Sequence, residues 1–260
     1  MIGFFDSGFG GVQTLKYFKE MYSDFDYVFL ADGKNCPYGP KSGDEIKKLT
    51  FDSLDWLFDN GAEIVILACN TAAAYSVRNW QTLYPEKKVL SITIPGIEEI
   101  LSRGDINGNV GILATQATVT SGIFDDLFTR FGGDGNPDFS FVSAPELVDL
   151  VESGFENEEK NIEIVKNILS KFPSNIKYLV LGCTHFPVLM KYFKMFFDGV
   201  IVDPSYEAAR KFGDYLKNHP EISSKLTHNG ILKFYTTGNA ESFETIGSKI
   251  FGQKIIANGI

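Results

Sequence analysis

The chain has 260 residues, of which 44% are hydrophobic and 22% are charged, and its formal net charge at pH 7 is −9. This composition is typical of a globular protein with a substantial core, organised as one large or two modest domains. The acidic balance argues against nucleic acid or an anionic membrane as the main partner, because both repel negative charge. It still permits a small anionic ligand, which a local group of backbone N–H groups can bind.

The opening residues and the cysteines of the chain indicate its cellular compartment. The opening residues, MIGFFDSGFGG, lack a basic start and reach Asp6 and several glycines at once, so we expect no signal peptide. No apolar run has the length that crosses a bilayer. The cysteines at positions 36, 69 and 183 are too few and too widely spaced for a disulfide framework. We therefore expect a cytoplasmic protein without a membrane partner.

Short apolar runs alternate with amphipathic segments along the whole chain. The apolar runs predict strands at about 2–5, 27–31, 64–68, 89–92, 110–113, 139–142, 178–182, 200–202 and 232–236. Segments with one apolar side predict helices at about 12–18, 46–58, 71–83, 146–152, 157–172, 206–216 and 240–251. Such alternation is typical of parallel sheets with helices on both faces, so an α/β fold is predicted.

The order of these elements repeats weakly. A strand leading to Asp6 opens one half and a strand leading to Thr115 opens another, and each half later contains a strand that ends in a cysteine. We therefore expect two pseudo-symmetric parallel-sheet α/β domains with the active site in the cleft between them. The first domain would comprise residues 1–93 and 206–260, and the second residues 94–205.

Two strands end in a cysteine that is followed by polar residues: Leu-Ala-Cys-Asn-Thr around Cys69 and Leu-Gly-Cys-Thr-His around Cys183. Pro187 indicates that a helix begins soon after Cys183, because proline suits the first helical position. In α/β sheets, ligands bind at the carboxyl ends of strands. A cysteine just before a helix faces the positive end of the helix dipole, which favours a lowered thiol pKa. A single buried cysteine is more often a small core residue, but the matched pair favours one site built from two halves.

Two opposed thiols suit the removal of a proton from one face of a carbon and its delivery to the other face. This chemistry is racemisation or epimerisation, since a single fixed base tends to return the proton to the face it came from. Asp6 and His185 are titratable neighbours that could relay protons for the thiols. Neutral polar residues in the corresponding turns could hold carboxylates together with backbone N–H groups. They are Ser7, Asn70, Thr71, Thr115, Thr118 and Thr184.

Several of these residues also have simpler interpretations. His185 could be a metal ligand, although no further Cys/His cluster accompanies it and we expect no metal site. The glycine-rich turn after Asp6 lacks the lysine and spacing of a phosphate-binding loop. Cys36 is interpreted as incidental, Tyr38 as either a packed loop aromatic or a ligand contact, and Glu152 as a solvated helix charge.

The chain resembles the glutamate racemases of the cofactor-independent aspartate/glutamate racemase superfamily. The likeness covers nearly the whole chain in the same order. The matching motifs are Asp6-Ser-Gly-Phe-Gly-Gly11, Pro37-Tyr-Gly39, Ala68-Cys-Asn-Thr71, the run with Thr115, Thr118 and Ser121, Leu181-Gly-Cys-Thr-His185, and Thr236-Thr-Gly238 with Phe243.

This resemblance implies interconversion of L- and D-glutamate without a cofactor, pyridoxal phosphate included, to supply D-glutamate for peptidoglycan. It also implies a homodimer. By the match, Cys69 takes the α-proton from D-glutamate with help from Asp6, and Cys183 takes it from L-glutamate with help from His185. Glu152 matches a further acidic position near the second cysteine. The substrate contacts implied are Asp6, Ser7, Tyr38, Gly39, Asn70, Thr71, Thr115, Thr118, Thr184 and His185.

One loop departs from the family pattern, and two other functions are compatible with the sequence. Many members carry a Gly-Asp-Thr-Ala-Arg-like run before Pro-Tyr-Gly, where this chain has Ala31-Asp-Gly-Lys-Asn-Cys36, without the arginine. Racemisation of aspartate or a related acid would use the same scaffold. A binding protein without catalysis is the other alternative, since some relatives inhibit DNA gyrase. The presence of both cysteines favours the enzyme.

Overall fold

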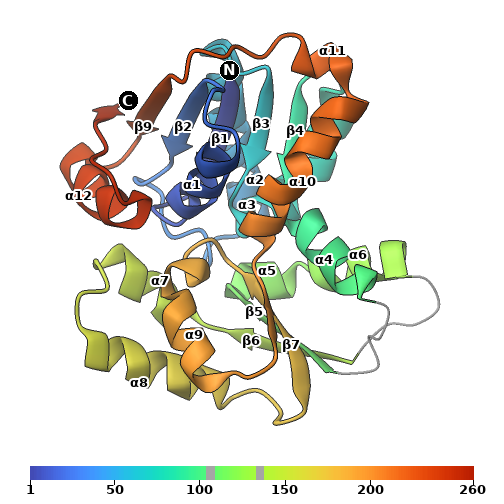
Figure 1. Ribbon diagram of the computed structural model, residues 1–260, viewed down its shortest axis with the longest axis vertical. Coiled ribbons are helices and arrows are strands. Elements are labelled where there is room, and N and C mark those ends of the chain that lie inside the picture. The colour runs from blue at the N-terminus through green and yellow to red at the C-terminus, as the bar shows by residue number, and fades with distance from the viewer. Residues whose placement is uncertain (104–108, 133–137) are drawn as a thin grey trace.

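A computed structural model describes residues 1–103, 109–132 and 138–260 of the protein. The described strands form two sheets, one above the other along the long axis of the molecule (Figure 1). The first has the order β10-β9-β2-β1-β3-β4, with β10 Ala257–Gly259, β9 Leu232–Thr236, β2 Tyr27–Ala31, β1 Ile2–Asp6, β3 Ile64–Leu67 and β4 Lys88–Ser91. The second has the order β6-β5-β7-β8, with β6 Phe139–Ser143, β5 Asn109–Ala114, β7 Ile176–Gly182 and β8 Val200–Val202. Every pairing in these sheets is parallel, which confirms the predicted α/β fold.

The two sheets repeat one topology. The order β2-β1-β3-β4 in the first sheet corresponds to β6-β5-β7-β8 in the second, as the faint repeat in the sequence predicted. The C-terminal strands β9 and β10 return to the first sheet and extend it beyond β2. We propose that the domain boundaries lie near residues 93 and 205, because the chain passes from one sheet to the other beside those positions.

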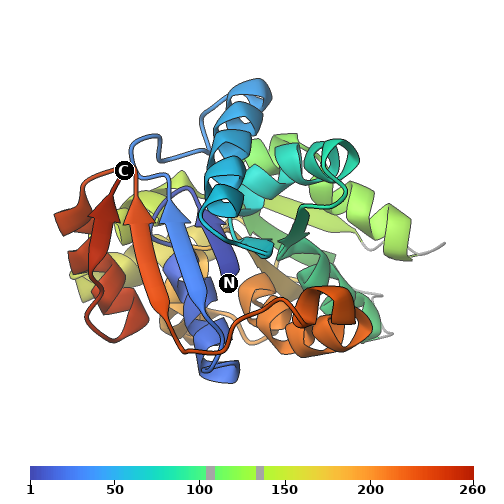
Figure 2. The ribbon, with the colours of Figure 1, turned by 90° about the horizontal axis from the view of Figure 1, so that it is seen from above.

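Helices cover both faces of the first sheet (Figure 2). One face carries α1 (Gly11–Met21), α10 (Pro204–Asn218) and α12 (Ala240–Phe251), and the other carries α2 (Gly43–Asp59) and α3 (Asn70–Leu83). Successive strand residues point to opposite faces. In β1, Phe4 therefore joins the cluster under α1, whereas Phe5 joins the cluster under α2 and α3, and both are fully buried. Burial on both faces explains why this strand is apolar throughout.

The second sheet is covered in the same way. Its helices are α7 (Pro145–Glu152), α8 (Glu158–Leu169) and α9 (Met190–Phe196) on one face, and α4 (Thr93–Ser102) and α6 (Ile123–Gly132) on the other. Shorter helices are α5 (Gln116–Thr120), α11 (Pro220–Ser223) and the 3-10 turn η1 (Phe186–Leu189). Pro187 lies in the first turn of η1, which leads directly into α9, so a helical segment begins soon after Cys183, as predicted. None of the helices in the described ranges is long and apolar enough to cross a membrane.

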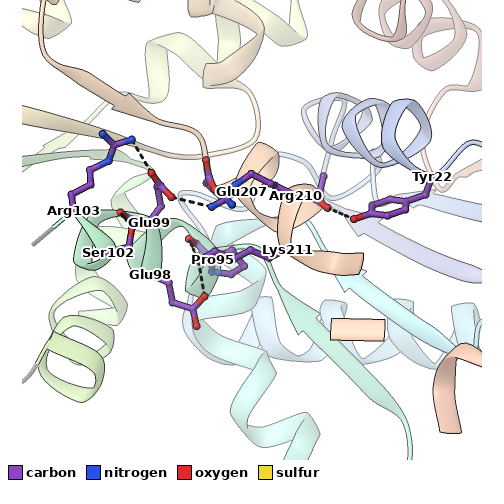
Figure 3. Close-up of polar contacts among 10 residues, drawn as sticks. Tyr22, Pro95, Glu98, Glu99, Ser102, Arg103, Glu207, Arg210 and Lys211 are labelled. Atoms are coloured by element: carbon purple, nitrogen blue, oxygen red, sulfur yellow. Dashed lines mark hydrogen bonds and ion pairs between the residues drawn. The ribbon is translucent and has the colours of Figure 1, made fainter. Parts of the chain in front are cut away.

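Two helices, α4 and α10, follow the positions where the chain passes from one sheet to the other, and they contact each other. Helices α4 and α10 pack along each other, and ion pairs join them (Figure 3). Arg210 Nη2 lies 3.1 Å from Glu99 Oε2, and Lys211 Nζ lies 2.8 Å from Glu98 Oε2. These pairs are partly exposed, so each contributes little to the free energy of folding.

Asp26 anchors the return of the chain into the first sheet. Its buried carboxylate accepts hydrogen bonds from the backbone N–H of Asn229 at 3.0 Å, the backbone N–H of Ile231 at 2.8 Å and the Asn229 side chain at 2.7 Å. These contacts set the register in which β9 meets β2. The sequence contains no local signal for them, because the partners are distant along the chain.

We expect Asp26→Ala to lower the free energy of unfolding by about 3 kcal/mol. The variant removes an ionised acceptor from three partly buried N–H donors, two from the backbone and one from the Asn229 side chain. Urea denaturation measures the loss. The matched control is Asp24→Ala, which removes an exposed carboxylate paired with His228 and should leave stability within experimental error. Equal effects of the two variants would contradict the anchoring role of Asp26.

Candidate functional site

A cavity of about 610 Å³ lies where the carboxyl ends of the two sheets meet. The turns after β1 and β3 line it from the first sheet, and the turns after β5 and β7 line it from the second. Most predicted site residues lie on its wall: Ser7, Tyr38, Gly39, Cys69, Asn70, Thr71, Thr115, Cys183, Thr184 and His185. The other three, Asp6, Thr118 and Glu152, are not on this wall and contact residues that are.

Cys69 is the N-cap of helix α3. Its sulfur accepts a hydrogen bond from the backbone N–H of Ala72 at 3.4 Å and lies 3.4 Å from Ser7 Oγ. Burial raises the pKa of the Cys69 thiol, the charge of Asp6 adds to this, and the pKa reaches about 12 despite both hydrogen bonds. The lowered pKa that the helix position predicted is therefore wrong, because the loss of solvent outweighs the helix dipole here. Cys69 carries a proton near neutral pH.

Cys183 begins a chain of polar contacts. Its sulfur lies 3.5 Å from His185 Nδ1, and His185 Nε2 lies 2.5 Å from Glu152 Oε1. Burial alone would lower the pKa of His185, but its interactions with Cys183 and the Glu152 carboxylate together raise it well above its usual value. The pKa of Glu152 is lowered, because contacts with His185, the Phe9 N–H and Cys36 outweigh its burial. These directions describe an imidazolium between a carboxylate and the sulfur.

Asp6 lies behind the cavity wall and is completely buried. Its Oδ1 accepts from the Gly8 N–H at 2.9 Å, and its Oδ2 accepts from the Thr184 hydroxyl at 2.9 Å. Burial raises the pKa of Asp6 to about 6, although His185 and the two donors oppose the rise. Gly10 packs against the same threonine so closely that any side chain would overlap it. Asp6 thus ties the first sheet to the cysteine turn of the second.

Polar groups around Cys69 provide donors for an anionic ligand. The hydroxyls of Thr71, Thr115 and Thr118 form a triangle with oxygen distances of 2.8, 3.1 and 2.9 Å that joins α3 to α5. Asn70 Oδ1 accepts from Thr93 Oγ1 at 3.0 Å, whereas the buried Asn70 Nδ2 has no hydrogen-bond partner among the described residues. A buried donor without a partner is costly, so a carboxylate oxygen of a ligand would complete it.

The loop before α2 supplies another part of the wall. The Tyr38 hydroxyl donates to Asp32 Oδ2 at 2.6 Å, and its ring packs against Phe5 with centroids 6.3 Å apart. Tyr38 is therefore both a packed aromatic and a lining residue. Gly39 faces Thr115 across the boundary between the sheets. This loop brings the two halves of the site together.

Sequence reasoning missed part of the wall. The additional lining residues include Lys41, Ser42, Tyr75, Gln116, Thr120, Pro145, Val148 and Asp149. No motif marks them, and only their place near strand ends hints at the site. Within residues 1–103, 109–132 and 138–260, no group of three or more His, Cys, Asp or Glu side chains could hold a metal ion.

We expect Asp6→Asn to stabilise the protein at pH 8 but not at pH 4. The folded pKa of about 6 lies above the ordinary 3.8, so the folded carboxyl holds its proton more tightly and stability falls as pH rises through this window. Asparagine cannot ionise but can still accept from Gly8 and donate to Thr184. The variant should gain about 3 kcal/mol over the wild type between pH 4 and 8, measured by urea denaturation at each pH. A pH-independent difference would contradict the perturbed carboxyl.

Comparisons with known proteins match both the sequence and the fold of the chain. The Asp/Glu/hydantoin racemase family matches residues 16–210. Glutamate racemase of Aquifex aeolicus is 31% identical over 255 residues, which are 98% of this chain and 95% of that protein. Among solved structures, glutamate racemase isoform RacE1 of Bacillus anthracis gives a TM-score of 0.90 at 26% identity, covering 100% and 97% of the two chains. Glutamate racemase of Francisella tularensis in complex with D-glutamate gives 0.88 at 26% identity, covering 100% and 96%. The chain is therefore a racemase that belongs to the Asp/Glu/hydantoin racemase family.

Proposed function

We propose that the protein interconverts L- and D-glutamate, with Cys69 and Cys183 as the two acid/base groups. The observation that carries this proposal is that one cavity has a cysteine at a strand end on each side, from equivalent positions of the two sheets. Sequence relatives named glutamate racemase and the D-glutamate complex of a structural relative support the substrate. We further propose that the enzyme is cytoplasmic, acts as a homodimer without a cofactor, and supplies D-glutamate for peptidoglycan.

The reaction needs one thiolate and one thiol. In the direction from L to D, the Cys183 thiolate takes the α-proton, the C–H electron pair stays on Cα, and the Cys69 thiol gives its proton to the opposite face. The reverse direction exchanges these roles. The high pKa of Cys69 keeps it protonated and ready to donate. The imidazolium of His185, paired with Glu152, would balance the negative charge on the Cys183 sulfur.

Substrate carboxylates would be held by neutral donors. Asn70 offers a side-chain N–H without a partner, and Thr71 lies beside it at the N-terminal end of α3. Helix N-termini stabilise anions through their free N–H groups and dipole. Ser7 offers a hydroxyl on the wall from the first sheet, whereas the Thr184 hydroxyl already donates its proton to Asp6. Together these groups would fix Cα between the sulfurs.

We expect Cys69→Ala and Cys183→Ala each to reduce racemisation by at least about 10²–10⁴-fold, because general acid–base groups contribute about that much. Circular dichroism and thermal unfolding should show that both variants keep the fold. A circular dichroism assay of L- and D-glutamate interconversion measures the rate. Wild-type activity in either variant would remove that cysteine from the mechanism. Assays with aspartate and other amino acids test the substrate.

Racemisation in D₂O tests the use of two bases directly. Starting from L-glutamate, early deuterium should appear at Cα of the D-glutamate product, because the second thiol delivers a proton derived from solvent. Little deuterium should enter the remaining L-glutamate at that stage, as judged by mass spectrometry after chiral separation. Rapid labelling of the starting enantiomer without inversion would instead indicate a single base.

A further inference from the structure

Cys36 lies on the wall of the cavity, in the loop between β2 and α2. From the sequence alone Cys36 is interpreted as incidental, whereas the fold brings it to the wall of the site. Its sulfur and Glu152 Oε1 both lie against Gly8, so the thiol is placed to donate a hydrogen bond to the Glu152 carboxylate, an interaction that contributes to the lowered pKa of Glu152. Burial, followed by the charges of Glu152 and Asp6, raises the pKa of the Cys36 thiol, so it remains a hydrogen-bond donor.

The turn after β1 is shaped to let the two groups meet. A side chain at Gly8 would overlap Glu152 Oε1 and would lie 2.8 Å from Cys36 Sγ. Only glycine leaves this space free. The next residue, Phe9, donates its backbone N–H to Glu152 Oε1 at 3.0 Å. The carboxylate from α7 is therefore held against two segments of the first sheet.

Glu152 in turn determines where His185 lies. Its Oε1 is 2.5 Å from His185 Nε2, and the other ring nitrogen faces the Cys183 sulfur at 3.5 Å. The Glu152 side chain retains 23% of its exposure, so it needs fixed donors to stay in one orientation. Four side chains thus form one line of contacts, in the order Cys36, Glu152, His185 and Cys183.

We propose that Cys36 is a positioning residue for the Cys183 half of the site: its thiol holds the Glu152 carboxylate, which orients His185 against the sulfur of Cys183. The proposal rests on the racemase function proposed above. No equivalent contact links Cys36 to Cys69, whose sulfur instead meets Ser7 and the Ala72 N–H. Loss of the Cys36 thiol should therefore slow proton transfer at Cys183 more than at Cys69.

Substrate deuterium isotope effects on kcat/KM, measured in both directions, separate the two transfers. In Cys36→Ala, kcat/KM should fall about tenfold, equivalent to about 1.4 kcal/mol. It must fall equally in both directions, because the two enantiomers have equal free energy. With 2-deutero-L-glutamate the isotope effect should rise, since cleavage of that bond at Cys183 becomes rate-limiting. With 2-deutero-D-glutamate it should fall, since delivery by Cys183 then limits the rate after cleavage.

Control variants distinguish positioning from general damage. Cys36→Ser keeps a donor and should restore most of the rate. Cys36→Val fills the space without a donor and should show the same loss of rate and the same isotope-effect shifts as Cys36→Ala. It replaces Cys36→Ala in the experiment if that variant does not fold. Ser7→Ala, beside Cys69, should shift the two isotope effects in the opposite sense. Isotope effects that are unchanged or move together in Cys36→Ala and Cys36→Val would overturn the positioning role. A wild-type protein that does not racemise glutamate would instead overturn the proposed function.

Discussion

The hydrogen bond from Thr184 to Asp6 joins the carboxyl ends of the two sheets, and the rest of the site depends on it. A carboxylate without solvent is unfavourable, as the raised pKa of Asp6 indicates, and only fixed donors from both halves make it tolerable. The same bond places the turn with Cys183 opposite the turn with Cys69. The buried Asp6 carboxylate therefore lowers the stability of the fold at the place where the carboxyl ends of the two sheets meet.

The two halves share a topology but surround their cysteines differently. Cys69 lies at a helix N-terminus, with a hydroxyl beside it and the Asp6 carboxylate nearby, which favours the protonated thiol. Cys183 lies beside an imidazolium whose other nitrogen meets Glu152, which suits a negatively charged sulfur. The proposed two-base reaction needs opposite protonation states of the two sulfurs in each direction, and these states exchange when the direction reverses.

The strands and both cysteines were predictable, because buried parallel strands are continuous apolar runs and polar residues at their ends stand out. The short elements β10, α5 and α11 were missed, since three to five residues carry no periodic pattern. The ten-residue helix α6 was also missed, although its buried residues Phe124, Leu127 and Phe128 have helical spacing. The predicted direction of the Cys69 pKa shift was wrong, because a local motif does not reveal that distant segments bury the thiol. For the same reason, the meeting of Cys36 with Glu152 required the folded chain.

A crystal structure of the protein with glutamate bound would show where Cα lies relative to the two cysteines. The sulfurs of Cys69 and Cys183 should lie on opposite faces of Cα, each within proton-transfer distance. A substrate carboxylate should accept a hydrogen bond from Asn70 Nδ2, which has no partner among the described residues. Glutamate bound with both sulfurs on one face, or with Cα away from either sulfur, would contradict the two-cysteine site.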